Sequence, residues 1–345
     1  MLERGRRRRE RRKARQRVAR PASYRGLVLG LAGVLVVVLG LVVFLASREP
    51  ASPPAPPVKA YPYTINDSLG TSTTFTQAPQ RVVSLSPDRT ALLLALGVGD
   101  RLVAVDLASL LPGEAPALPR LDASALDLEA LKALQPDMVF LGREHEGYLE
   151  RLSALGIASF YLWEPLNTTA LGAQVQVFGS IFNVPTRALE LITDLQAQQK
   201  AVVDRVADVA SGPRVYYEAS PAPTGASEAS WPGSLLATLK ARNVVTEGGA
   251  IFPKVSLLAI RARDPEVILL ASPPEQLSLE TLKQRPGWDE ITAVKTGRVY
   301  YVDRALVGQP TLRVKEALET LGRLLYPERF SASGASAPAG TPGAR

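Results

Sequence analysis

The hydrophobic residues of this chain follow two patterns, a continuous run near the start and a long alternation after it. Residues 26–46 form a run of 21 residues without a charged or strongly polar side chain. A helix of that length rises about 30 Å, which matches the hydrocarbon thickness of a bilayer. No small-x-small cleavage motif follows, so we expect a retained transmembrane helix and not a cleaved signal peptide.

After this run, short apolar strands alternate with amphipathic helices. Strands are predicted over 81–85, 102–105, 138–141 and 157–162, with helices over 90–96, 127–134 and 145–155. The alternation returns with strands over 214–217, 267–270 and 298–302, and helices over 234–239, 257–261 and 312–325. Such alternation is typical of parallel sheets covered by helices. We therefore predict an α/β fold with two Rossmann-like βαβ lobes.

A connector rich in Leu, Ala and Gln separates the two series. From residue 185 to residue 208, apolar residues recur at helical spacing and predict one long helix. A rigid helix between two lobes leaves little room for hinge closure, so we expect a cleft that opens only modestly. The predicted organisation is a basic cytoplasmic tail (1–25), a transmembrane helix (26–46), a Pro-rich linker (47–60), an N-terminal ligand-binding lobe (61–165), a helical connector (166–210), a C-terminal ligand-binding lobe (211–330) and a disordered tail (331–345).

The two predicted lobes contain an internal repeat. Residues 128–139 (LEALKALQPDMV) match residues 257–268 (LLAIRARDPEVI) as a helix, a Pro-acid turn and a buried strand. This pattern predicts two related lobes that face each other across a cleft, which is the usual place for a ligand. The alternative is that the same αβ-loop chemistry is simply used twice.

The charge of the chain is concentrated in its first 25 residues. They contain twelve Arg or Lys residues against two Glu, a net charge that exceeds the +7 of the whole chain. An arginine run can bind nucleic acid or anionic lipid, but beside a transmembrane segment it is also the signal for a cytoplasmic N-terminus. We expect the second role, with no nucleic acid as partner and the C-terminal domain on the outer side. The chain has no cysteine, which argues against a lipoprotein anchor.

Several collinear motifs resemble one known family. They are INDSLG at 65–70, RVVSLSP at 81–87, ALGVGDRLV at 95–103, the segment 128–137, RPGWD at 285–289 and AVKTGRVY at 293–300. Together they are similar to the Fe(III)-siderophore and cobalamin (Fe/B12) family of ABC-importer substrate-binding proteins, over about residues 61–328. The resemblance implies a class III bilobal fold with a long rigid helix and a ligand in a shallow cleft.

The resemblance also implies partners. Members of the family dock on the permease subunits of the importer, which work with a cytoplasmic ATPase, through a surface glutamate on each lobe. The first position matches Glu129, whereas the second is position 258, where this chain has leucine. We expect docking that is weakened or skewed, because charged pairs chiefly give orientation and partner choice.

Candidate ligand contacts follow the carboxyl ends of the predicted strands, where open α/β sheets bind ligands. Aromatic side chains offer flat apolar area there, and arginines offer paired donors to anionic oxygens. Trp288 is more typical of simple packing, Tyr217 fits either role, and His145, the only histidine, is more typical of a solvent-facing loop residue. Phe252 and Gly142 occupy positions where cobalamin-binding relatives carry stacking tryptophans. The predicted ligand-binding residues are Ser86, Pro87, Asp88, Arg89, Arg143, His145, Trp163, Tyr217, Trp231, Phe252 and Trp288.

Chemistry by the protein itself is not expected. The chain has no cysteine nucleophile, no G-x-S-x-G elbow and no phosphate-binding glycine motif. One histidine is too few for a typical free-metal site. We therefore predict a membrane-tethered binder without cofactor, which delivers a metal chelate, such as a ferric siderophore or a cobalamin- or haem-like macrocycle, to an ABC importer. The alternative is a tethered sensor or interaction module with impaired docking.

Overall fold

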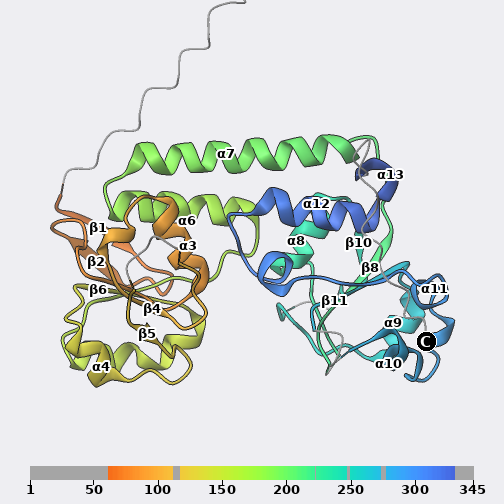
Figure 1. Cartoon of the computed structure of the whole chain (residues 1–345), viewed down its shortest axis with the longest axis horizontal. Coiled ribbons are helices and arrows are strands. Elements are labelled where there is room, and N and C mark those ends of the chain that lie inside the picture. Colours follow the sequence, from red (N-terminus) through yellow and green to blue (C-terminus); the bar gives the residue numbers. More distant parts are fainter. Residues whose placement is uncertain (1–60, 112–116, 222, 247–248, 273–276, 331–345) are drawn as a thin grey trace, which may run out of the picture. The chain divides into compact units, whose positions relative to one another are not determined.

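The computed structural model describes residues 61–111, 117–221, 223–246, 249–272 and 277–330 (Figure 1). The predicted tail, transmembrane helix and linker (1–60) and the predicted C-terminal tail (331–345) lie outside these residues. Within the described part of the chain, no helix is both long enough and apolar enough to cross a membrane.

The first lobe is built on a five-stranded parallel sheet with the strand order β5-β4-β3-β6-β7. Its strands are β3 (Val82–Ser84), β4 (Leu102–Asp106), β5 (Arg120–Leu121), β6 (Met138–Leu141) and β7 (Ser159–Tyr161). An antiparallel hairpin of β1 (Tyr63–Asn66) and β2 (Ser72–Phe75) precedes them. Every residue of β6 is buried, because helices cover both faces of the sheet.

Two hydrophobic clusters lie on opposite faces of this sheet. Along β6, Met138 and Phe140 belong to one cluster with residues of α3, whereas Val139 and Leu141 belong to the other with residues of α4 and α5. The helices are α3 (Pro87–Ala95), α4 (Leu128–Ala133) and α5 (Leu149–Ala154), with 3₁₀ turns η1 (Gly99–Arg101) and η2 (Arg143–Tyr148). The single helix expected over 145–155 is thus wrong in its first half, which is the 3₁₀ turn η2.

The second lobe repeats this plan with the parallel strand order β10-β8-β11-β12, and β9 pairs antiparallel with β8. Helix α8 begins at Trp231 and not at residue 234, because the Ser230 hydroxyl caps it by accepting from Gly233 N–H at 3.0 Å. The strands are β8 (Arg214–Ser220), β9 (Thr224–Gly225), β10 (Arg242–Asn243), β11 (Val267–Leu270) and β12 (Val299–Tyr301). The helices are α8 (Trp231–Thr238), α9 (Leu257–Arg263), α10 (Leu279–Lys283), α11 (Thr292–Lys295), α12 (Val314–Leu325) and α13 (Pro327–Phe330), with turns η4 (Trp288–Glu290) and η5 (Arg304–Gly308).

The internal repeat is present in the structure as two equivalent helix-turn-strand units. In the first lobe α4 leads into β6, and in the second α9 leads into β11. The Asp137 carboxylate accepts from the backbone N–H of Arg81 at 2.9 Å, at the edge of β3. The Glu266 carboxylate accepts in the same way from Arg214 N–H at 2.8 Å, at the start of β8. The acidic residue after each proline therefore joins two neighbouring strands at their amino ends.

The connector consists of two helices, and the second is the long helix predicted from residue 185. Helix α6 (Thr168–Ile181) ends before Asn183, which is left-handed at φ 57°, and Pro185 then begins α7 (Pro185–Val203). Helix α7 spans about 28 Å and packs against both α6 and α12 (Figure 1). One cluster of buried residues runs from the first sheet through these helices to the second sheet. The long helix is therefore supported along its length by a shared core.

Candidate functional site

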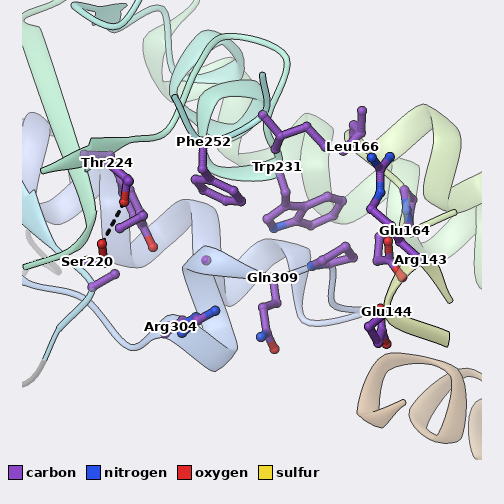
Figure 2. Close-up of a pocket in the computed structure, with 17 residues that line it drawn as sticks. Arg143, Glu144, Glu164, Leu166, Ser220, Thr224, Trp231, Phe252, Arg304 and Gln309 are labelled. Atoms are coloured by element: carbon purple, nitrogen blue, oxygen red, sulfur yellow. Dashed lines mark hydrogen bonds between the residues drawn. The ribbon is translucent and has the colours of Figure 1, made fainter. Parts of the chain in front are cut away.

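A cavity of about 530 Å³ lies where the carboxyl ends of the strands of both lobes meet. The first lobe contributes residues that follow β6 and β7, including Arg143, Glu144 and Glu164. The second lobe contributes the end of β8, the first residue of α8, the segment at 251–252 and the turn η5. Figure 2 shows the three first-lobe side chains together at one end of the cavity and the Ser220 and Thr224 pair at the other end.

Aromatic side chains form much of the second-lobe wall. Trp231 is 2% exposed and Phe252 is 43% exposed, and both line the cavity (Figure 2). Tyr217 also lines it, because alternate residues of β8 point to opposite faces of the sheet. Tyr217 therefore lies on the cavity side, whereas Tyr216 packs in the cluster on the other face. Flat apolar walls of this kind suit a ligand with a planar surface.

Arg89 does not reach the cavity mouth, where it was expected. Its side chain is fully buried and donates to Ser86 Oγ at 3.1 Å, to the Leu162 carbonyl at 2.7 Å and to Glu164 Oε1 at 3.3 Å. Gly142 leaves the space for this arrangement, since a Cβ atom there would lie 2.5 Å from Glu164 Oε1 and 2.8 Å from Arg89 Nη1. Arg89 thus fixes the position of Glu164, and its charge is already compensated.

His145 is fully buried, which does not fit a solvent-facing loop histidine, and it does not line the cavity. Its Nδ1 accepts from Gly142 N–H at 3.1 Å, and its Nε2 has no hydrogen-bond partner among the described residues. Burial lowers the pKa of His145; Arg89 lowers it further, whereas Glu144, Glu164 and Asp106 raise it. The net direction is downward, so the neutral imidazole is the form that the fold favours.

This burial predicts a pH dependence of stability that one substitution isolates. An unfolded histidine has a pKa of about 6.5 and takes up a proton before the folded one does. The contribution of His145 is therefore fully present above that value and is lost as pH falls through the lowered folded pKa. We expect His145→Asn, whose amide oxygen can replace Nδ1 as acceptor, to reduce the loss of unfolding free energy between pH 7 and pH 5 by about 1 kcal/mol.

The measurement is urea unfolding of both proteins at several pH values. Because His145 is the only histidine, no other imidazole contributes to the difference. Parallel pH profiles for the two proteins would contradict a lowered pKa for His145.

Trp163 and Arg143 form a cation–π pair at the edge of the cavity. The Arg143 Cζ lies 5.9 Å from the centre of the Trp163 ring, which is 52% exposed. Arg143 lines the cavity, but Trp163 does not. The backbone N–H of Trp163 donates to Ser68 Oγ at 3.1 Å, which connects the strand end to the β1–β2 hairpin. Trp163 therefore orients Arg143 from outside.

The other predicted contacts lie away from the cavity. Trp288 is fully buried in the cluster on the opposite face of the second sheet, where it packs edge-to-face on Tyr216 at 6.0 Å. Pro87 and Asp88 form the first turn of α3, Ser86 is the residue before that helix, and none of the three lines the cavity. Proximity to a strand end is thus too coarse a criterion, because the first residues of α3 lie outside the cavity whereas the first residue of α8 lines it.

Several cavity residues were not among the predicted contacts. Arg304, Gly308, Gln309 and Pro310 come from η5 and the residues after it, which follow the carboxyl end of β12. The strand-end rule applied to the predicted strand 298–302 points to this segment. Among the described residues, no group of His, Asp and Glu is arranged to hold a metal ion.

Comparison with known proteins agrees with this architecture. The family model of the periplasmic binding protein matches residues 82–306. An uncharacterised ABC transporter substrate-binding lipoprotein of Bacillus subtilis is 25% identical over 79% of this chain and 88% of its own length. A vitamin B12-binding protein of Photorhabdus laumondii is 27% identical over 59% of this chain and 74% of its own length.

Solved structures show the same fold. A periplasmic haem-binding protein from Pseudomonas aeruginosa superposes with a TM-score of 0.63 at 26% identity, covering 72% of this chain and 93% of that protein. The periplasmic vitamin B12-binding protein of Vibrio cholerae gives a TM-score of 0.62 at 20% identity, covering 73% and 99%. The two parallel sheets, the connecting helix and the match over residues 82–306 lead to one conclusion: the chain belongs to the periplasmic binding protein family, and it is a binding component of transport and not an enzyme.

Proposed function

We propose that this protein is the membrane-tethered substrate-binding protein of an ABC importer, and that it captures a metal chelate in the cavity between its lobes. The observation that carries the proposal is the cavity itself, with Trp231 and Phe252 on one lobe and Arg143 on the other. Its volume lies within the range of small-molecule sites, roughly 300–1,000 Å³. Relatives named for vitamin B12 and haem support a chelate with a planar macrocycle, and a ferric siderophore is the other candidate.

The direct experiment is a titration of the purified full-length protein with ferric siderophores, cobalamin and iron protoporphyrin. Tryptophan fluorescence and the melting temperature report binding independently. One saturable ligand that raises the melting temperature with concentration, as mass action requires, supports the proposal. No response to any chelate contradicts it.

Phe252→Ala tests whether the cavity is the binding site. Phe252 is nearly half exposed, so its truncation should leave the fold stable while it removes aromatic contact from the ligand. We expect affinity to fall about tenfold, since one stacked aromatic pair contributes on the order of 1 kcal/mol beyond its area. Leu69→Ala is the control, because Leu69 is equally exposed but lies in the β1–β2 turn. Equal affinities for both variants would place the ligand elsewhere.

Docking is the second part of the proposal, with Glu129 as the contact on the first lobe. Glu129 is an exposed residue in the first turn of α4, and Leu258, its counterpart in the repeat, is 72% exposed on α9. The alternative function is a sensor or interaction module, and the apolar side chain at position 258 is the observation that favours it. Stimulation of ATP hydrolysis by the reconstituted importer distinguishes the two.

We expect Glu129→Ala to reduce that stimulation several-fold at a fixed protein concentration, with ligand affinity unchanged. Glu280→Ala is the matched control, since Glu280 is an exposed residue in the first turn of α10. If the unaltered protein binds its chelate but never stimulates the ATPase, the sensor function is the better description.

A further inference from the structure

Two hydrogen-bond donors in the cavity wall are buried without a partner. The Tyr217 hydroxyl and the Trp231 Nε1–H make no hydrogen bond within the described part of the chain. Tyr217 is only 1% exposed, and both residues line the cavity. Other buried donors, such as the Trp288 Nε1–H, also lack a partner among the described residues, but Trp288 does not line the cavity. Because buried polar groups are nearly always paired in folded proteins, the two unpaired donors that do line it point to acceptors that a ligand supplies.

The fold holds both donors in fixed positions. A Cβ atom at Gly308 would lie 2.7 Å from the Tyr217 hydroxyl oxygen, so the glycine leaves the space that the phenol occupies. Trp231 is the first residue of α8, and the Ser230 cap fixes that turn. Burial raises the pKa of Tyr217, and Arg304 only partly opposes this effect. The phenol therefore keeps its proton and remains a donor.

A positive charge lies in the same cavity wall, close enough to Tyr217 to influence its phenol. Arg304 lines the same cavity, and a Cβ atom at Gly308 would lie 2.9 Å from the Arg304 Cγ as well as close to the phenol. The guanidinium is exposed and forms no ion pair with any described residue. The two carboxylates of the described cavity wall, Glu144 and Glu164, both come from the first lobe. The second-lobe wall thus offers donors and positive charge without a carboxylate of its own.

We propose that Tyr217, Trp231 and Arg304 form a recognition site for a carboxylate group on the bound chelate. The inference rests on the proposed function, because it assigns chemistry to the ligand of that same cavity. A carboxylate accepts from an O–H, an N–H and a guanidinium together, and its charge matches Arg304. A chelate with peripheral carboxylates is therefore preferred over one whose carboxylates are esterified.

The test compares iron protoporphyrin, which has two free carboxylates, with its dimethyl ester. We expect the full-length protein to bind the acid at least about tenfold more tightly than the ester, because hydrogen bonds to a charged group are roughly twice as strong as neutral ones. Tyr217→Phe and Arg304→Met should each weaken binding of the acid about tenfold and leave binding of the ester nearly unchanged.

Tyr216→Phe is the matched control. Tyr216 precedes Tyr217 on β8, is equally buried and faces the opposite side of the sheet, so its substitution should not alter the preference. Equal affinity for acid and ester, or a preference that survives both cavity variants, overturns the inference while the proposed function stands. Tight binding of uncharged cobalamin that Arg304→Met does not weaken overturns it as well. Failure of every chelate to bind overturns the proposed function itself.

Discussion

Arg285→Met is expected to lower the free energy of unfolding by about 3–5 kcal/mol, because it leaves the Glu218 carboxylate buried and unpaired. Glu218 is fully buried on β8 and accepts from both Nη atoms of Arg285, at 2.6 and 2.7 Å. The Arg285 guanidinium also stacks on Trp288, with its Cζ 4.5 Å from the ring centre. The substitution therefore removes the positive charge that pairs with Glu218. It also removes the contact that holds residues 285–288 against the sheet.

The pH dependence of this loss identifies its cause. Burial already raises the pKa of Glu218, and removal of Arg285 raises it further. A raised folded pKa means that the variant is most stable at low pH, where the carboxyl is neutral in both states, and loses stability as pH rises through that pKa. Chemical denaturation from pH 4 to pH 8 should show a deficit that grows with pH.

Two further variants control this prediction. Arg313→Met removes an exposed Arg–Glu pair with Glu316 and should cost only a small fraction of that amount, because solvent screens the pair. Combining Arg285→Met with Glu218→Gln should restore part of the lost stability. A deficit that is independent of pH and unchanged in the double variant would mean that packing against Trp288, and not the charge, causes the loss.

Gly233→Ala is expected to lower both stability and ligand affinity. A Cβ atom at this position would lie 2.0 Å from the Ser227 carbonyl oxygen and 2.9 Å from the Glu228 Cα. Because these neighbours belong to the backbone, the first turn of α8 must move, and with it Trp231. We expect about 3 kcal/mol less unfolding free energy, since overpacking a tight site typically costs 1–3 kcal/mol. Chelate affinity should fall at least about tenfold.

Gly147→Ala is the control for this substitution. Gly147 lies in η2, has no heavy atom within 4 Å of its Cβ position and has no positive φ. Alanine there should be neutral or slightly stabilising, because it reduces the freedom of the unfolded chain. Thermal unfolding and the chelate titration test both variants, and equal melting temperatures would contradict the steric argument.

Much of the fold follows from the periodicity of hydrophobic residues and from the turn-forming residues between them. The strands β4, β6 and β11 were predicted to within one residue, because each is an uninterrupted apolar run between turns. The long helix predicted from residue 185 is confirmed as α7, whereas the helix before it, α6, was expected only as part of a helical connector. The two-residue strands β5, β9 and β10 were not predicted, because so short a strand carries no periodic signal.

The cavity was predictable in outline but not in detail. The rule that ligands bind at the carboxyl ends of strands correctly assigned Arg143, Tyr217 and Trp231 to the cavity. It could not show that Arg89 is enclosed by Ser86, Leu162 and Glu164, because that depends on the space left at Gly142. Nor could it separate Tyr217, a residue of β8 on the cavity side of the sheet, from Trp288, which lies in η4 and packs in the cluster on the other side.

The core that both lobes share beneath α7 has a consequence for how the protein unfolds. Buried residues of both sheets and of the helices between them belong to one cluster, so separating the two halves exposes apolar residues of each. Both halves should therefore melt in one cooperative calorimetric transition, and neither should fold as an isolated fragment. A ligand that contacts a few side chains in the cavity would then stabilise residues at the far edge of each sheet against hydrogen exchange.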